Sequence, residues 1–239
     1  MIGADILLSC LEKQGVDLVF GLPGGAVIPL YDRLKHFGVK HILMRHEQGA
    51  VHAADGYARA TGKVGVCFAT SGPGAANMMT GLGTASMDSI PLVMISGQVA
   101  SSLLGKDSFQ EAYVTGMADA VTKASVMVTD ASQIPQVLAD AFYIASHGRP
   151  GPVLVDIPKD LFTQDVKNPD LEQTGENSCA IGSIAGTISF GYLFNCGVEG
   201  GTVAGNDNVG GLVGQTLHNT ARIYACYNAG TAVFGDMLA

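Results

Sequence analysis

The chain has 239 residues, 47% of them hydrophobic, which is enough for one ordinary domain with a full core and a smaller appendage. It carries 13 basic and 21 acidic residues, a formal net charge of −8, and no basic patch interleaved with aromatic residues, which excludes an ordinary nucleic-acid-binding protein. No run approaches roughly 18 apolar residues, and the N-terminus lacks a basic segment followed by a long apolar one. We therefore expect a cytoplasmic protein without a membrane span.

The first part of the chain repeats one pattern, a short apolar run that ends in a glycine turn. The runs and their turns are Asp17 to Phe20 before Gly21-Leu22-Pro23-Gly24-Gly25, Val64 to Thr70 before Ser71-Gly72-Pro73-Gly74, and Pro91 to Ile95 before Ser96-Gly97-Gln98. Buried strands ending in such turns are typical of a parallel sheet with its ligand edge at the carboxyl ends. We predict a six-stranded parallel α/β sheet flanked by helices over residues 1–166, with Glu47, Gly72 and Gln98 at one edge.

Glu47 is the strongest candidate for a functional side chain. It follows the apolar run His41 to Met44 and begins an alanine-rich helical segment that includes Val51. A carboxylate at the carboxyl end of a strand, next to small apolar residues, should be partly desolvated and suited to sharing a proton. The alternative is a first-turn Glu that only interacts with the helix dipole.

These turns, with Arg45-His46-Glu47-Gln48-Gly49-Ala50, Asn77 and the run from Gly148 to Asp160, resemble one known family. Residues 2–166 are similar to the N-terminal pyrimidine-binding domain of thiamine-diphosphate enzymes, and most of all to the large subunit of acetolactate (acetohydroxyacid) synthase. Other thiamine enzymes, such as oxalyl-CoA decarboxylase or sulfoacetaldehyde acetyltransferase, stay open as alternatives.

The resemblance implies a role for each matching residue. Glu47 would be catalytic, hydrogen-bonding N1′ of the cofactor's aminopyrimidine ring, with Pro73 and Asn77 near that ring and Gln110 lining the site. Phe109 would form the wall of the substrate channel and Lys159 its entrance, and Arg149 would contact FAD. The alternatives are a helix first-turn role for Asn77, core packing for Phe109, and solvated loop charges for Arg149 and Lys159.

The resemblance also implies cofactors and partners. It predicts thiamine diphosphate, FAD and Mg²⁺, a 2-oxo acid substrate such as pyruvate, and a role in branched-chain amino-acid biosynthesis. The Gly-Asp-Gly motif with which the family holds Mg²⁺ and diphosphate does not occur, so we expect a half-site that is inactive until a diphosphate-domain partner completes it. No metal site is predicted within the chain. The small-residue helix Gly49 to Ala60 predicts a homodimer.

After Val166 the composition changes. Residues 167–178 read as a polar linker, and residues 179–239 are rich in Gly and Asn. Phe194-Asn195-Cys196 and Tyr224-Ala225-Cys226 lie 30 residues apart, which indicates a repeat and predicts short β-solenoid coils. The segment resembles GLUG-type glycine-rich repeats of bacterial surface proteins. A non-catalytic interaction or surface protein is therefore the second functional hypothesis, and the joint between the two parts could be a real fusion or an artefact.

Other chemistries lack their markers. The sequence contains no Walker A motif and no Gly-x-Ser-x-Gly elbow, and the Gly72-Pro73-Gly74 turn does not continue as a dinucleotide fingerprint. The five cysteines have no spacing typical of zinc sites. We expect Cys10 and Cys67 to be small buried hydrophobes, and Cys196 and Cys226 to occupy matching repeat positions.

Overall fold

The computed structural model describes Met1–Gly175 throughout, together with the backbone of ten short strands between residues 181 and 234. The chain divides into two compact units, Met1–Gly175 and Glu176–Ala239. The first unit contains every candidate site residue.

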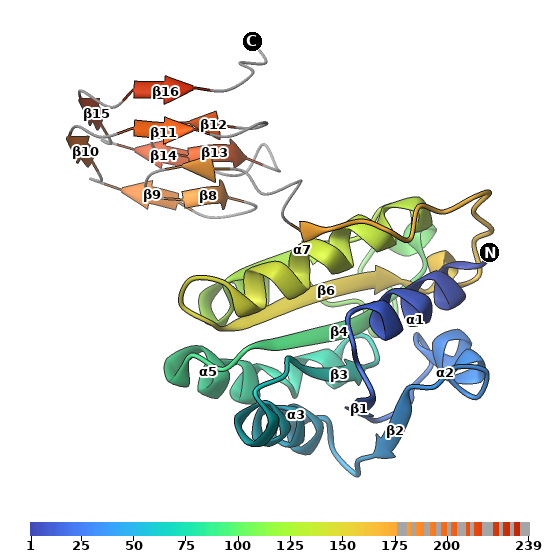
Figure 1. Ribbon diagram of the computed structural model, residues 1–239. Helices are drawn as coiled ribbons and strands as arrows, with labels where there is room; N and C mark the ends of the chain where they lie inside the picture. The colour runs from blue at the N-terminus through green and yellow to red at the C-terminus, as the bar shows by residue number, and fades with distance from the viewer. Residues whose placement is uncertain are drawn as a thin grey trace. The chain divides into compact units, whose positions relative to one another are not determined.

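A single six-stranded sheet forms the centre of the first unit (Figure 1). Its strands run over Leu18–Gly21 (β1), Lys40–Leu43 (β2), Gly65–Ala69 (β3), Leu92–Gln98 (β4), Ala124–Met127 (β5) and Pro152–Pro158 (β6). Their order across the sheet is β2-β1-β3-β4-β6-β5, and every neighbouring pair is parallel. The predicted six-stranded parallel sheet is therefore confirmed.

Helices cover both faces of this sheet. The α-helices are Gly3–Lys13 (α1), Ile28–Leu34 (α2), Glu47–Thr61 (α3), Pro73–Ala76 (α4), Met79–Asp88 (α5), Val114–Ala118 (α6) and Ile134–Ser146 (α7). Four short 3₁₀ helices span Ser101–Leu103 (η1), Asp119–Val121 (η2), Ala131–Gln133 (η3) and Lys159–Phe162 (η4).

The core lies in two layers because successive side chains of a strand point to opposite faces. On β4, Val93 and Ile95 pack with the buried residues of α1, α2 and α7. Leu92 and Met94 pack with those of α3, α5 and α6. Both faces of the central strands are buried, as expected for a parallel sheet between helical layers.

Helix α3 packs closely on α5 because Gly81 has no side chain. A Cβ atom at Gly81 would lie 2.1 Å from Cγ1 of Val51, so no larger residue fits without a shift. The backbone N–H of Gln48 donates to the His46 side chain at the start of α3, and Gly62, at φ 72°, ends the helix in the left-handed conformation. These local signals fix where α3 begins, and therefore where Glu47 lies.

Residues 167–175, which the sequence assigned to a linker, belong to the first compact unit. Leu171 packs against the core layer that contains α1 and α7. A Cβ atom at Gly175 would lie 2.4 Å from Cβ of Tyr143 on α7, so the chain runs close to that helix.

The second unit shows a repeat in its strand pairing. Its strands are Ile181–Gly182 (β7), Ala185–Ile188 (β8), Tyr192–Phe194 (β9), Gly197–Glu199 (β10), Thr202–Ala204 (β11), Val209–Gly210 (β12), Val213–Thr216 (β13), Arg222–Tyr224 (β14), Tyr227–Ala229 (β15) and Ala232–Phe234 (β16). Each pairs in parallel with a strand 28 or 30 residues away, such as Ile181 with Val209 and Gly197 with Tyr227. Parallel pairing at offsets that differ by only two residues is what stacked coils produce. The repeat cysteines Cys196 and Cys226 lie outside the described residues.

Candidate functional site

Glu47 lies at the carboxyl edge of the sheet, as predicted. It is the first residue of α3, which begins soon after β2 ends. The turn Ser71–Gly72 follows β3 at the same edge, and β4 ends there at Gln98. Glu47 is buried, with 8% of its surface exposed. A buried carboxylate therefore lies at the edge where open α/β sheets bind their ligands.

Two contacts define the surroundings of this carboxylate. The side-chain amide of Asn77 donates a 3.0 Å hydrogen bond to Oε2 of Glu47. A Cβ atom at Gly74 would lie 3.2 Å from Oε1, so the absence of a side chain there lets the glycine turn approach the carboxylate closely. Among residues 1–175, no other side chain bonds to the Glu47 carboxylate, and Oε1 keeps its capacity to accept a proton or hydrogen bond.

The turn after β3 also accommodates a second segment of the site. Gly72 has φ 61°, and a Cβ atom there would lie 2.6 Å from the carbonyl oxygen of Gln110. The backbone of Gln110, itself at φ 61°, thus packs onto the Gly72 turn. Pro73 is exposed at the first position of α4. The structure therefore gathers Glu47, Pro73, Asn77 and the Gln110 backbone around one glycine turn.

Phe109 and Lys159 are exposed residues that follow β4 and β6, whose carboxyl ends lie at the same edge. Phe109 is 89% exposed, so the alternative interpretation that it packs in the core is wrong. Lys159 is exposed and directly follows β6, whose last residue pairs with Gln98 of β4. An aromatic ring this exposed, next in the chain to the Gln110 backbone at the Gly72 turn, is available to contact a ligand or another protein surface.

Arg149 lies at the other edge of the sheet. Arg149 precedes β6, whereas Glu47, Pro73 and Lys159 follow the strands before them. Because β6 rises about 3.3 Å per residue, the two edges lie roughly 20 Å apart. Its guanidinium donates to Oγ of Ser89 at 2.8 Å and to the carbonyl oxygens of Ser86 and Met87 at the end of α5. Within this domain Arg149 therefore closes a helix terminus and takes no part in the Glu47 cluster.

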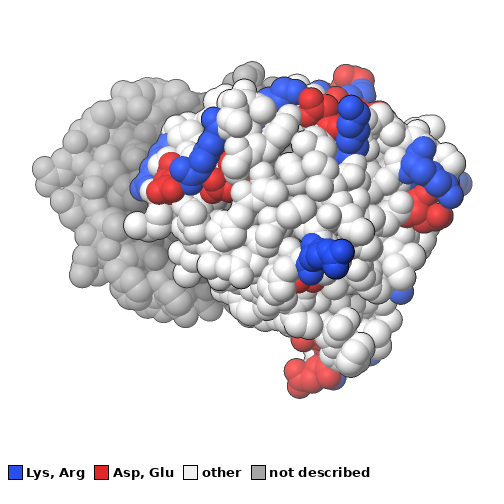
Figure 2. Space-filling view, turned by 90° about the horizontal axis from the view of Figure 1, so that it is seen from below, with Lys and Arg blue, Asp and Glu red and all other residues white. Residues whose placement is uncertain are grey.

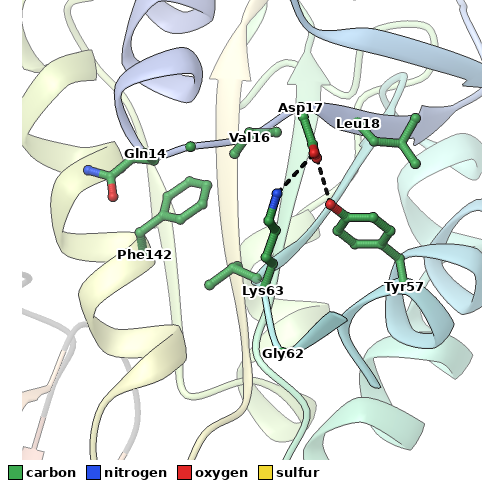
Figure 3. Close-up of a pocket in the computed structure, with 10 residues that line it drawn as sticks. Gln14, Val16, Asp17, Leu18, Tyr57, Gly62, Lys63 and Phe142 are labelled. Atoms are coloured by element: carbon green, nitrogen blue, oxygen red, sulfur yellow. Dashed lines mark hydrogen bonds and ion pairs between the residues drawn. The ribbon is translucent and has the colours of Figure 1, made fainter. Parts of the chain in front are cut away.

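A groove of about 320 Å³ opens at the amino edge of the sheet, beside the residue that precedes β1 (Figure 3). Tyr57 and Lys63 point toward Asp17 across it and donate hydrogen bonds of 2.6 and 2.9 Å to its carboxylate. These bonds lower the pKa of Asp17 to about 2. The charged groups of the groove, Asp17 and Lys63, form an ion pair with each other. The groove lies at the opposite edge from Glu47 and is therefore not part of this site.

Comparison with known proteins shows the family to which the N-terminal segment belongs. Residues 1–118 match the family described as thiamine pyrophosphate enzyme, N-terminal TPP binding domain. The N-terminal segment is a thiamine pyrophosphate enzyme N-terminal domain. The expected resemblance is thereby confirmed for this segment.

Curated relatives of this domain include acetolactate synthases. The acetolactate synthase large subunit of Corynebacterium glutamicum is 56% identical over 173 residues, which are 72% of this chain and 27% of that protein. The acetolactate synthase isozyme 2 large subunit of Escherichia coli is 57% identical over 161 residues, 67% of this chain and 29% of that protein. The chain thus spans less than a third of the length of the curated relatives it matches.

One buried polar group in the domain was not predicted from the sequence. Asp156 on β6 is 1% exposed and accepts hydrogen bonds from Ser96 at 2.6 Å and Gln98 at 2.9 Å. Burial raises its pKa to about 6, although both hydrogen bonds lower it. Polar residues at alternate positions of an otherwise apolar strand, Ser96 and Gln98, were the available signal. They share the face on which Asp156 lies.

The domain contains few other reactive groups. The described residues include no cluster of three or more His, Cys, Asp or Glu side chains that could hold a metal ion. Cys10 and Cys67 are buried as predicted, and burial raises the pKa of both thiols, which leaves them protonated and unreactive. No helix in the described part of the chain combines the length and apolarity needed to cross a bilayer.

Proposed function

We propose that residues 1–166 form the half-site that binds the aminopyrimidine ring of thiamine diphosphate in an acetolactate-synthase-like enzyme. The observation that carries the proposal is the Glu47 carboxylate, buried at the carboxyl edge, fixed by Asn77 through Oε2 and open at Oε1 beside Gly74. A carboxylate held in this way can share a proton with a ring nitrogen, which is general acid–base work. The glycine turn leaves room for a flat ring to approach it.

Each neighbouring residue has a role in this proposal. Asn77 holds the Glu47 carboxylate in one orientation through its 3.0 Å hydrogen bond. Pro73 and Gln110 border the ring from the Gly72 turn. Exposed Phe109 and Lys159 lie where a substrate would enter. Arg149 would contact FAD from the opposite edge, as the family resemblance suggests, in addition to its bonds to the end of α5.

The substrate class follows from the relatives rather than from the half-site. When bound, thiamine diphosphate supplies the electron sink that allows a 2-oxo acid to lose carbon dioxide and be joined to a second 2-oxo acid. Pyruvate is the substrate we propose, within branched-chain amino-acid biosynthesis. The described residues contain no cluster of His, Cys, Asp or Glu that could hold Mg²⁺. Mg²⁺ and the diphosphate would therefore be held by a partner's diphosphate domain.

A second copy of the chain is the proposed direct partner. Helix α3 presents a stripe of small residues, namely Gly49, Ala53, Gly56 and Ala60, which are exposed or half-buried. Figure 2 looks at the molecule from the side on which α3 and α5 lie and shows a broad surface with few charged side chains. A weakly charged surface with a small-residue stripe lets two helices approach closely, which supports a homodimer through this layer.

The test is acetolactate formation from pyruvate by the full chain, with thiamine diphosphate, Mg²⁺ and FAD, before and after a separately expressed diphosphate-domain fragment is added. We expect activity only with the fragment, and a loss of about 10²-fold or more in Glu47→Gln, which keeps the shape but cannot take the proton. Glu172→Gln, an exposed carboxylate near no candidate residue, is the matched control and should keep the wild-type rate.

Three outcomes would overturn parts of this proposal. Acetolactate formation by the chain alone would contradict the half-site. Full activity in Glu47→Gln would leave Glu47 as a structural first-turn residue. Failure of the wild type to bind thiamine diphosphate in the presence of the fragment would favour a non-catalytic interaction protein.

A further inference from the structure

The segment 99–113 carries Phe109 and Gln110. The Glu111 carboxylate ties its part from Gly105 to Glu111 together, and Nζ of Lys106 donates to the carbonyl oxygen of Ser102 at 2.6 Å. Glu111 accepts hydrogen bonds from the backbone N–H of Ser108 at 2.9 Å and from that of Gly105. These bonds lower the pKa of Glu111, which keeps it charged and bound. Because the carboxylate ties the segment's own backbone together, we expect the segment to move as a unit. Its attachment points then decide where Phe109 and Gln110 lie.

Two hydrogen-bonded attachments of the segment lead to the carboxyl end of β6. At the start of the segment, Asp160 accepts hydrogen bonds from the backbone N–H and the hydroxyl of Ser101 at 2.8 and 3.1 Å. At its end, Nε2 of Gln98 donates to the carbonyl oxygen of Ala112 at 2.9 Å, and the same nitrogen donates to Oδ2 of Asp156 at 2.9 Å. The second attachment therefore continues from Ala112 through Gln98 into the buried core.

The oxygen and the nitrogen of the Gln98 side-chain amide both form hydrogen bonds, and Asp156 determines the orientation of this amide. Its Oε1 accepts from the backbone N–H of Val99 at 2.9 Å, and both hydrogens of Nε2 are donated. If the amide turned over, its oxygen would face two acceptors, the Asp156 carboxylate and the Ala112 carbonyl. Ser96 holds the other carboxylate oxygen at 2.6 Å, so Asp156 cannot rotate away. The carboxylate thus keeps the Gln98 donor directed at Ala112.

We propose that Asp156 is a positioning residue that acts through Gln98 to hold segment 99–113 against the Gly72 turn, and so sets where Phe109 and Gln110 lie beside Glu47. Gln110 contacts that turn closely, since a Cβ atom at Gly72 would lie 2.6 Å from its carbonyl oxygen. The tether itself is independent of any ligand. Its importance for catalysis rests on the proposed function.

The test measures amide hydrogen exchange of residues 99–113 in the ligand-free full chain. Asp156→Leu keeps the shape and removes both acceptor oxygens. Asp156→Asn can still accept from Gln98 through its oxygen and donate to Ser96 through its nitrogen. Gln98→Met removes the tether itself. We expect exchange about tenfold faster in Asp156→Leu and Gln98→Met, wild-type exchange in Asp156→Asn, and unchanged protection of α1 and α7 in all three.

A double-mutant cycle decides whether Asp156 acts through Gln98. Asp156→Leu combined with Gln98→Met should exchange no faster than Gln98→Met alone, because the same tether is already lost. The chain contains no Trp, so Phe109→Trp gives a single fluorescent reporter on the segment, and its anisotropy should fall in the same variants that exchange faster. Met87→Trp, exposed at the end of α5, is the control reporter and should not respond.

Several results would overturn the proposal. These are unchanged exchange of residues 99–113 in Asp156→Leu, additive effects in the double variant, or equal loss of protection in α1 and α7. If Asp156→Leu does not fold, Gln98→Met is decisive, and unchanged exchange in that variant overturns the tether. Failure of Glu47→Gln to lose activity would overturn the proposed function and leave these exchange results standing.

Discussion

The side-chain amide of Asn77 donates a 3.0 Å hydrogen bond to Oε2 of Glu47, which joins the junction of α4 and α5 to the first residue of α3. Asn77 is the residue after α4, and its side chain is exposed apart from this contact. The interpretation of Asn77 as a plain first-turn residue does not account for this bond. Its position fits a residue that orients the carboxylate.

Replacement of Asn77 tests this orientation. Asn77→Ala removes the only side-chain donor to Glu47 among the described residues, so the carboxylate gains freedom to rotate. We expect the rate of acetolactate formation by the completed enzyme to fall by about tenfold, the effect of one hydrogen bond to a charged group. Stability should change by less than about 1 kcal/mol because the residue is exposed. Thr80→Ala, also exposed in this layer, should keep the wild-type rate; equal losses in both variants would contradict the role.

Two glycines of α5 should respond oppositely to replacement by Ala. In Gly81→Ala the new Cβ would meet Cγ1 of Val51 at 2.1 Å, and separating α3 from α5 should destabilise the fold by about 1–3 kcal/mol. In Gly83→Ala the nearest atom lies at an ordinary 3.7 Å, and the gain in helix propensity should stabilise by about 0.5–1 kcal/mol. Urea unfolding measures both. A neutral Gly81→Ala would mean that the two helices pack less closely than described.

The raised pKa of Asp156 predicts how stability depends on pH. Its carboxyl titrates near 6 in the folded protein and near 3.8 when unfolded, so the folded state binds more protons between these values. Stability from this group is therefore fully present below about pH 4 and is lost as pH rises through 6, by up to about 3 kcal/mol.

Asp156→Asn removes this titration and provides the measurement. Its free energy of unfolding relative to the wild type should rise between about pH 4 and pH 8. Urea unfolding of both proteins across this range cancels the contribution of every other group that they share. A difference that stays constant with pH would show that Asp156 has an ordinary pKa in the folded state.

Association through α3 is testable at Gly56. A Cβ atom at this exposed glycine would meet nothing within 4 Å in one copy of the chain, so Gly56→Leu should leave the isolated fold stable. In a dimer formed through the small-residue stripe, the larger side chain should hold the two helices apart. We expect sedimentation to show a dimer for the wild type at tens of micromolar and a monomer for Gly56→Leu. A wild-type monomer at that concentration, or a dimer unaffected by the substitution, would place association elsewhere.

The fold followed from local sequence patterns, whereas the proposed roles of Pro73, Asn77 and Gln110 came from the family resemblance. Short apolar runs that end in glycine turns specify parallel strands with a common carboxyl edge, which is why Glu47, Gly72 and Gln98 were correctly predicted to share it. Glycine turns and helix starts depend on neighbouring residues, so their positions can be inferred without knowing the rest of the chain.

Which side chains contact each other at that edge depended on the tertiary structure. The family resemblance gave Arg149 a contact to FAD, and the strand direction of β6 puts it at the edge opposite Glu47, bonded to the end of α5. Asp156 gave no signal within its own strand, because a single carboxylate in an apolar strand acquires its partners, Ser96 and Gln98 of β4, only when β4 and β6 pair in register. Hydrogen bonds such as Asn77 to Glu47 join residues 30 positions apart, and only the packing of α3 against the turn after β3 decides whether two such groups meet.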